Sequence, residues 1–195
     1  MNTIITEKTD EGEVSYDVFS KLVDNRILFL SDYIKDDVAT DIIATLLYLD
    51  KEKEQISLYI NSSGGDPRSV FMIYDIMKMI KAPIATYCIG SATYETVLIL
   101  AAGTKGLRHA TKSSTICINQ LIVGEHRYSN MTDAEILMKQ AKKNNEKFID
   151  ALSDCINKPV KRILKDTERE FFLSPDEAKK YGVIDVVIGS KHERK

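Results

Sequence analysis

The residues of this chain that could do chemistry lie in the stretch 84–103, which reads IATYCIGSATYETVLILAAG. An apolar, strand-like run at 84–89 meets a break at Gly90-Ser91, and a helical pattern follows over 92–102. A strand, a tight turn and a helix form a nucleophile elbow, which holds one side chain at the carboxyl edge of a sheet. That side chain is Tyr94, whose phenol, with an ordinary pKa of about 10, is a poor nucleophile.

Short apolar strands and helices alternate around this elbow. We predict strands at 26–30, 56–60, 84–89, 106–109, 115–118 and 183–188, and helices at 16–22, 36–49, 67–80, 92–102, 132–156 and 175–180. Such alternation is typical of an α/β domain with flanking helices and a mainly parallel sheet, and we assign residues 1–195 to one domain. Residues 1–14 are polar and lack periodicity, so we expect a flexible arm there.

Residue types that favour helix ends support three of these helices. Asp66 and Pro67 fit the N-cap and first position of the helix at 67–80. Ser174, Pro175 and Glu177 combine an N-cap, a first-position proline and a capping glutamate. For the helix at 132–156, the predicted start is a capping box of Thr132 and Glu135.

The helix predicted at 132–156 is about twice as long as the average helix of about 11–12 residues. Ala141, Phe148, Leu152 and Cys155 form an apolar stripe along it. A helix of this length should project from a small α/β body. We therefore expect that a partner subunit covers the stripe, and burial within the chain itself is the alternative.

The composition excludes several classes of function. The chain has 27 Lys and Arg against 29 Asp and Glu, and its net charge of −2 gives no support for nucleic-acid or membrane binding. It has no apolar run of about 18 residues, and its start lacks the pattern of a signal peptide. Cys88, Cys117 and Cys155 have no metal-like spacing, so we expect no metal, no cofactor and reduced thiols in the cytoplasm.

Several motifs occur in the order and spacing of one protein family. They read SYDVFSKLVDNRILFL, LYINSSGGD, IYDIM, KGLRHA and DTEREFFLSPDEAKKYGVID. The chain resembles the Clp protease proteolytic subunit (ClpP) family over residues 15–188. The resemblance implies a crotonase-like ClpP fold with a handle region at about 121–156, and heptameric rings stacked as a tetradecamer. A Clp-class ATPase would feed unfolded protein into the chamber. A crotonase-type acyl-CoA enzyme would share the fold but not the carboxyl-terminal motif.

The resemblance also implies the positions of a serine triad, and all three differ from the family pattern. Tyr94 follows GSAT at the position of the serine, Asn119 in INQL stands at that of the histidine, and Glu170 before FFLS at that of the aspartate. The Asn119 amide cannot take up a proton near neutral pH. Loss of the serine or the histidine alone costs about 10⁶ in rate in subtilisin. We therefore expect no serine-peptidase activity from this chain alone.

Substrate-binding positions follow from the same resemblance. Gly65 and Glu95 would supply the backbone N–H groups of an oxyanion hole. Backbone N–H groups are present whatever the side chain is, so the substitutions would not remove the hole. The substrate groove would include Pro67, Ile122 and Val123. Pro67 has no N–H with which to pair an extended substrate, so the groove differs from the family pattern as well.

Positions for assembly complete the residues that the resemblance implies. Contacts between rings are implied for Gln120, Glu168 and Arg169. The pocket in which the ATPase docks would include Tyr59, Tyr87 and His109. Ser57 and His109 replace residues that are usually aromatic in the family, which weakens the argument for docking.

Three hypotheses remain. The leading one is an inactive, ClpR-like subunit that assembles with active ClpP, since the catalytic positions have changed beside retained assembly motifs. The second is a peptidase with unconventional residues such as Ser91, Thr93 or His126. The third is a homomeric scaffold without a role in proteolysis.

Overall fold

The computed structural model of the chain describes residues 3–9, 12–121 and 130–189, and within them a sheet of seven strands forms the centre. Five strands lie in the order β3 (Ile27–Ser31), β4 (Ile56–Ser62), β5 (Ile84–Thr93), β6 (Arg108–Thr111) and β9 (Val186–Ile188). Neighbours along this path are parallel. β7 (Thr115–Ile118) runs parallel to the end of β5, and β8 (Phe171–Leu173) is antiparallel to β7. The predicted α/β class with a mainly parallel sheet is confirmed.

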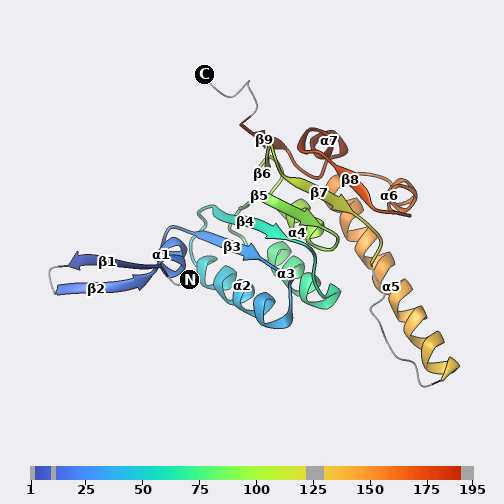
Figure 1. Cartoon of the computed structure of the whole chain (residues 1–195), viewed down its shortest axis with the longest axis horizontal. Helices are drawn as coiled ribbons and strands as arrows, with labels where there is room; N and C mark the ends of the chain where they lie inside the picture. Colours follow the sequence, from blue (N-terminus) through green and yellow to red (C-terminus); the bar gives the residue numbers. More distant parts are fainter. Residues whose placement is uncertain (1–2, 10–11, 122–129, 190–195) are drawn as a thin grey trace.

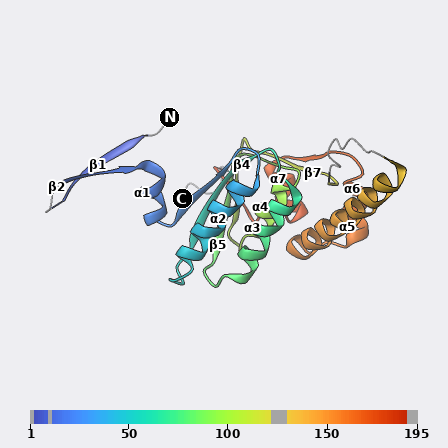
Figure 2. The same ribbon diagram turned by 90° about the horizontal axis from the view of Figure 1, so that it is seen from below.

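Three helices pack side by side against this sheet (Figures 1 and 2). They are α2 (Asp36–Leu49), α3 (Pro67–Met79) and α4 (Thr96–Ala102). Every residue of α4 is buried, which makes it the central helix of the core. Fully buried aliphatic side chains from strands and helices meet here, among them Leu30, Leu46, Leu58, Ile60, Ile73 and Leu98.

Helix α5 (Met131–Ile156) is the predicted long helix, and its amino-terminal half extends away from the sheet (Figure 1). Its carboxyl half packs beside α4, where Phe148 and Leu152 are fully buried by the chain itself. The expectation that a partner subunit covers these two residues is therefore wrong. The exposed apolar residues lie instead on the projecting half, at Met131, Ile136 and Met138.

The start of α5 also differs from the prediction. Asn130 is the N-cap, and its side-chain oxygen accepts the Asp133 N–H at 2.9 Å. The Asn130 amide in turn donates to the Asp133 carboxylate at 2.8 Å. This reciprocal pair begins the helix before Thr132, so the capping box predicted for Thr132 and Glu135 is wrong.

The arm predicted over residues 1–14 forms a β-hairpin in its described part. β1 (Ile4–Thr9) pairs antiparallel with β2 (Gly12–Asp17), and the hairpin projects at the end of the molecule opposite α5 (Figure 1). The residues of β2 are exposed apart from Tyr16, and its apolar alternation is limited to Val14 and Tyr16, which is too short to predict a strand. Asp17 then caps α1 (Val18–Asp24) by accepting the N–H groups of Phe19 and Ser20.

Local capping signals elsewhere are confirmed. The Asp66 carboxylate accepts the Arg68 N–H at 2.9 Å at the start of α3. Ser174 and Glu177 form the predicted capping box of α7 (Pro175–Tyr181). The short elements α6 (Val160–Asp166) and β8 were not predicted. No helix in the described part of the chain is both long enough and apolar enough to cross a membrane.

Candidate functional site

The elbow is longer on its strand side than the sequence indicates. β5 continues through Gly90 to Thr93, because β7 pairs with Ser91–Thr93 and the Asn61 side chain accepts the Ser91 N–H at 3.1 Å. The predicted break at Gly90-Ser91 is therefore wrong, and α4 begins at Thr96 rather than at residue 92. The turn is made at Tyr94, whose φ of 55° lies in the left-handed region that non-glycine residues seldom adopt. Such a strained turn is typical of a nucleophile elbow.

Hydrogen bonds at both ends of Tyr94 fix its position. Its N–H donates to the Cys117 carbonyl at 2.8 Å, which extends the pairing of β5 with β7. Its phenol donates to the Glu170 carboxylate at 2.5 Å. This hydrogen bond raises the pKa of Tyr94, and desolvation and the charge of Glu170 add to the effect.

The sheet brings the three predicted triad positions to the same end of β7. Asn119 directly follows β7 and Glu170 directly precedes β8, while Ile118 and Phe171 pair across the two strands. Tyr94 and Glu170 are in contact. The side-chain oxygen of Asn119 instead accepts a hydrogen bond from the Gln120 N–H at 2.9 Å. The arrangement thus holds a phenol, a carboxylate and an amide, none of which is an activated nucleophile.

The two residues predicted to form an oxyanion hole are also in contact. The Gly65 N–H donates to the side-chain carboxylate of Glu95 at 3.3 Å. Gly65 packs against Ile34 so closely that a Cβ at this position would lie 2.4 Å from the Cβ of Ile34. Burial raises the pKa of Glu95, although its own N–H and that of Gly65 oppose this shift.

Only part of the predicted substrate groove falls within the described residues. Pro67 is the first residue of α3, next to the Asp66 cap. Ile122 and Val123 lie outside the described residues, as does His126, one of the unconventional residues of the second hypothesis.

Of the two alternative nucleophiles, Ser91 has neutral partners and Thr93 is buried. The Ser91 hydroxyl donates to the Asn61 side-chain oxygen at 3.3 Å and lies 3.5 Å from the Ser62 carbonyl. Thr93 is buried, with 9% of its surface exposed. Amide and carbonyl oxygens do not take up a proton near neutral pH, so these contacts do not activate Ser91. Within 3–9, 12–121 and 130–189, no cluster of three or more His, Cys, Asp or Glu side chains could hold a metal ion.

Comparison with known proteins bears on this combination of an elbow and a mainly parallel sheet. A protein-family model described as Clp protease matches residues 10–191 of the 195 residues. The chain belongs to the Clp protease family. The match confirms the resemblance stated from the motifs, and the arrangement of sheet, helices and projecting α5 is consistent with the ClpP fold of that family.

In this Clp protease family member, the predicted docking residues belong to a stack of aromatic rings across four strands. Phe29, Tyr59, Tyr87 and His109 are register partners on β3, β4, β5 and β6. Their ring centroids are separated by 5.3, 4.7 and 4.5 Å in that order. Phe29 was not among the predicted residues, although its place in the apolar run of β3 could have indicated it.

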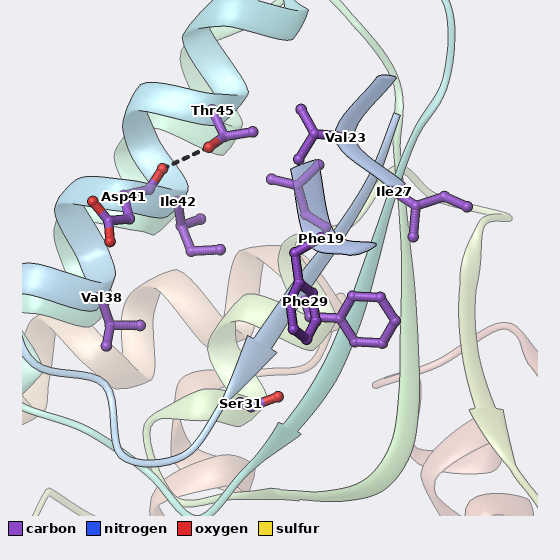
Figure 3. Close-up of a pocket in the computed structure, with 10 residues that line it drawn as sticks. Phe19, Val23, Ile27, Phe29, Ser31, Val38, Asp41, Ile42 and Thr45 are labelled. Atoms are coloured by element: carbon purple, nitrogen blue, oxygen red, sulfur yellow. Dashed lines mark hydrogen bonds between the residues drawn. The ribbon is translucent and has the colours of Figure 1, made fainter. Parts of the chain in front are cut away.

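A cavity of about 330 Å³ lies at the Phe29 end of this stack (Figure 3). The Phe19 ring of α1 meets the Phe29 ring edge-on at 5.8 Å. Val38 and Ile42 of α2 line the cavity as well. The stack therefore continues into an apolar depression between α1, β3 and α2.

Three residues were predicted to form contacts between the heptameric rings of subunits, and all three are accessible in the single chain. Gln120, Glu168 and Arg169 are all exposed. They lie in the segments that follow β7 and precede β8, close in sequence to Asn119 and Glu170.

Proposed function

We propose that this chain is a catalytically inactive, ClpR-type subunit of an ATP-dependent Clp protease complex. The observation that carries the proposal is the hydrogen bond from Tyr94 to Glu170. At the predicted serine and aspartate positions, a neutral phenol donates a hydrogen bond to a carboxylate. The predicted histidine position, 119, has an amide. A serine triad requires an imidazole that takes the proton of the nucleophile and returns it to the leaving amine. The residues at these three positions supply neither the nucleophile nor the base.

In this proposal the chain contributes surfaces rather than chemistry. Its partners are active ClpP subunits, with which it forms heptameric rings that stack as a tetradecamer. Exposed Gln120, Glu168 and Arg169, together with the projecting half of α5, support a role in contacts between rings. The stack that includes Tyr59, Tyr87 and His109 supports docking of a Clp ATPase. We also propose a cytoplasmic location, since the three cysteines are free thiols.

Co-expression with an active ClpP paralogue tests the proposal. A tag on this chain alone would be used to purify particles, and native mass spectrometry would count the two kinds of subunit. We expect mixed particles whose peptidase activity scales with the number of active subunits. Arg169→Ala should lower the yield of mixed particles, whereas Lys165→Ala, another exposed basic residue, should not.

The subunit composition and labelling by an active-site probe distinguish the alternatives. Only homo-oligomers, with no Clp partner, would contradict the proposal and support a homomeric scaffold. Labelling of the purified chain by a fluorophosphonate, abolished by Ser91→Ala or Thr93→Ala, would contradict it in favour of an unconventional peptidase. The neutral partners of Ser91 argue against that outcome.

A further inference from the structure

The side chain of Glu95 occupies an unusual place for a carboxylate. Glu95 is the residue before α4 and is only 7% exposed. Its carboxylate lies next to the N–H of Gly65, which donates to it at 3.3 Å. A charged group is costly to bury unless hydrogen bonds compensate it. Within the described residues, this compensation comes from the Gly65 N–H, and no basic side chain there forms an ion pair with Glu95.

The loop around Gly65 is held so that this N–H points at Glu95. Ile34 brackets the loop, since its N–H donates to the Gly64 carbonyl at 3.0 Å and its carbonyl accepts the Asp66 N–H at 2.8 Å. Ile34 thus bonds the Gly64 carbonyl and the Asp66 N–H on either side of Gly65. The Gly65 N–H between them donates to the Glu95 carboxylate. Backbone N–H groups held in this way form an anion-binding site.

The contact is also closely packed. Gly64 has a φ of +121°, and a Cβ at this position would lie 2.9 Å from the Glu95 carboxylate oxygen. A side chain at Gly64 would therefore compete with the carboxylate for the same space.

We propose that the Glu95 carboxylate is a built-in ligand of the Gly65 and Glu95 N–H groups, which keeps a substrate carbonyl out of the predicted oxyanion hole. The inference rests on the proposed function, because that function identifies these N–H groups with the hole. Removal of one oxyanion-hole donor costs about 10²–10³ in rate in subtilisin. A carboxylate that occupies the hole blocks the site independently of the substitutions at 94 and 119.

Rescue by acetate tests the proposal on the full chain alone. Glu95→Ala empties the N–H pair, and acetate supplies the missing carboxylate. We expect acetate to raise the Tm of Glu95→Ala by about 2–4 °C more than that of the wild type, because a ligand that binds only the folded state stabilises it. Sodium chloride at equal ionic strength and the neutral analogue acetamide should not produce this difference.

Two further variants make the result decisive. Glu170→Ala also removes a carboxylate near Tyr94, but Glu170 is exposed, so water can replace its carboxylate and acetate should give no extra shift. Glu95→Ser keeps a good N-cap residue for α4 and should show the same rescue if Glu95→Ala does not fold. An equal acetate shift in all variants, or none in either Glu95 variant, would overturn the proposal.

The outcome is separable from that of the proposed function. If acetate fails to stabilise Glu95→Ala while mixed particles still form, only the proposal of an internal ligand is overturned. If acetate stabilises Glu95→Ala but no mixed particles form, the proposed ClpR-type function is overturned and the proposal of an occupied anion site stands.

Discussion

The phenol of Tyr94 lies 2.5 Å from the carboxylate of Glu170, although 76 positions separate the two residues in the chain. Tyr94 stands in the left-handed turn between β5 and α4, and Glu170 directly precedes β8. Because the phenol donates to a carboxylate, its pKa is raised above the ordinary value and it stays neutral at physiological pH. Tyr94 therefore acts as a hydrogen-bond donor in the elbow and not as a nucleophile.

Tyr94→Ser should not create a peptidase. The new hydroxyl would have the elbow position, but Asn119 offers no group that could accept its proton. Loss of the histidine alone costs about 10⁶ in rate in subtilisin, so we expect activity about that far below an intact triad. Fluorophosphonate labelling and peptide hydrolysis would measure this, with an active ClpP paralogue as the positive control. Activity of Tyr94→Ser within about 10²-fold of the paralogue would show that another base exists.

Elements with local signals could be predicted from the sequence. The helix predicted at 36–49 has the bounds of α2, because its buried residues Ala39, Ile42, Leu46 and Leu49 recur at helical spacing. The capping box of Ser174 and Glu177 likewise depends on residues three positions apart. Family motifs then predicted the fold, as the match to the Clp protease family confirms.

Features that depend on distant contacts could not be predicted in this way. Gly90-Ser91 has the composition of a break, but Asn61 and β7 supply hydrogen bonds that keep it in a strand. The contact of Tyr94 with Glu170 exists only once β7 has paired with both β5 and β8. The Glu95 carboxylate was missed as well, since only the backbone of Glu95 was considered there.

Tyr87→Ala should destabilise the chain through the aromatic stack. The Tyr87 ring lies between those of Tyr59 and His109, with centroids at 4.7 and 4.5 Å. Each aromatic pair contributes about 0.5–1.5 kcal/mol beyond its buried area, so we expect a loss of about 1–3 kcal/mol in the free energy of unfolding. Urea denaturation would measure this loss.

Tyr48→Ala is the matched control for this substitution. Tyr48 is 59% exposed and has Lys51 over its ring at 4.6 Å. Such exposed cation–π pairs are worth about 0.5–1 kcal/mol. Equal effects of the two substitutions would show that the stack adds nothing to stability.

Ile136→Glu should weaken the proposed stacking of two rings. Ile136 is 60% exposed on the projecting half of α5, so the substitution adds a charge without disturbing the core of the chain. If α5 helices of opposite rings pair there, the charge must be desolvated on assembly. Sedimentation velocity should show a shift from double to single rings. Met79→Glu, at another exposed apolar residue of 64% exposure, should leave the double ring intact. An unchanged double ring in Ile136→Glu would exclude this part of α5 from the interface.

Asp185→Asn should be the most destabilising single substitution among these. Asp185 and Arg108 form a bidentate ion pair, in which Nη2 and Nε of Arg108 donate to the two carboxylate oxygens of Asp185 at 2.6 and 2.8 Å. The Arg108 side chain is only 4% exposed. Arg108 also donates to the carbonyls of Ala101 and Cys155, so the pair joins β6 to α4, α5 and the start of β9. Removing one partner of a buried ion pair costs about 3–5 kcal/mol, because the other charge stays buried. Glu13→Gln, in an exposed pair with Lys8, should cost less than about 1 kcal/mol.

The same pair predicts how stability depends on pH. Burial alone would raise the pKa of Asp185, but hydrogen bonds and charge from Arg108 outweigh burial and lower it. An aspartate with a lowered pKa in the folded state stabilises the fold above its unfolded pKa of about 3.9. That contribution is lost as the pH falls from about 4 through the folded pKa. The difference in unfolding free energy between wild type and Asp185→Asn should therefore shrink between pH 7 and pH 3. Urea denaturation across this range would measure it, and a constant difference would show that Asp185 does not gain its stability from ionisation beside Arg108.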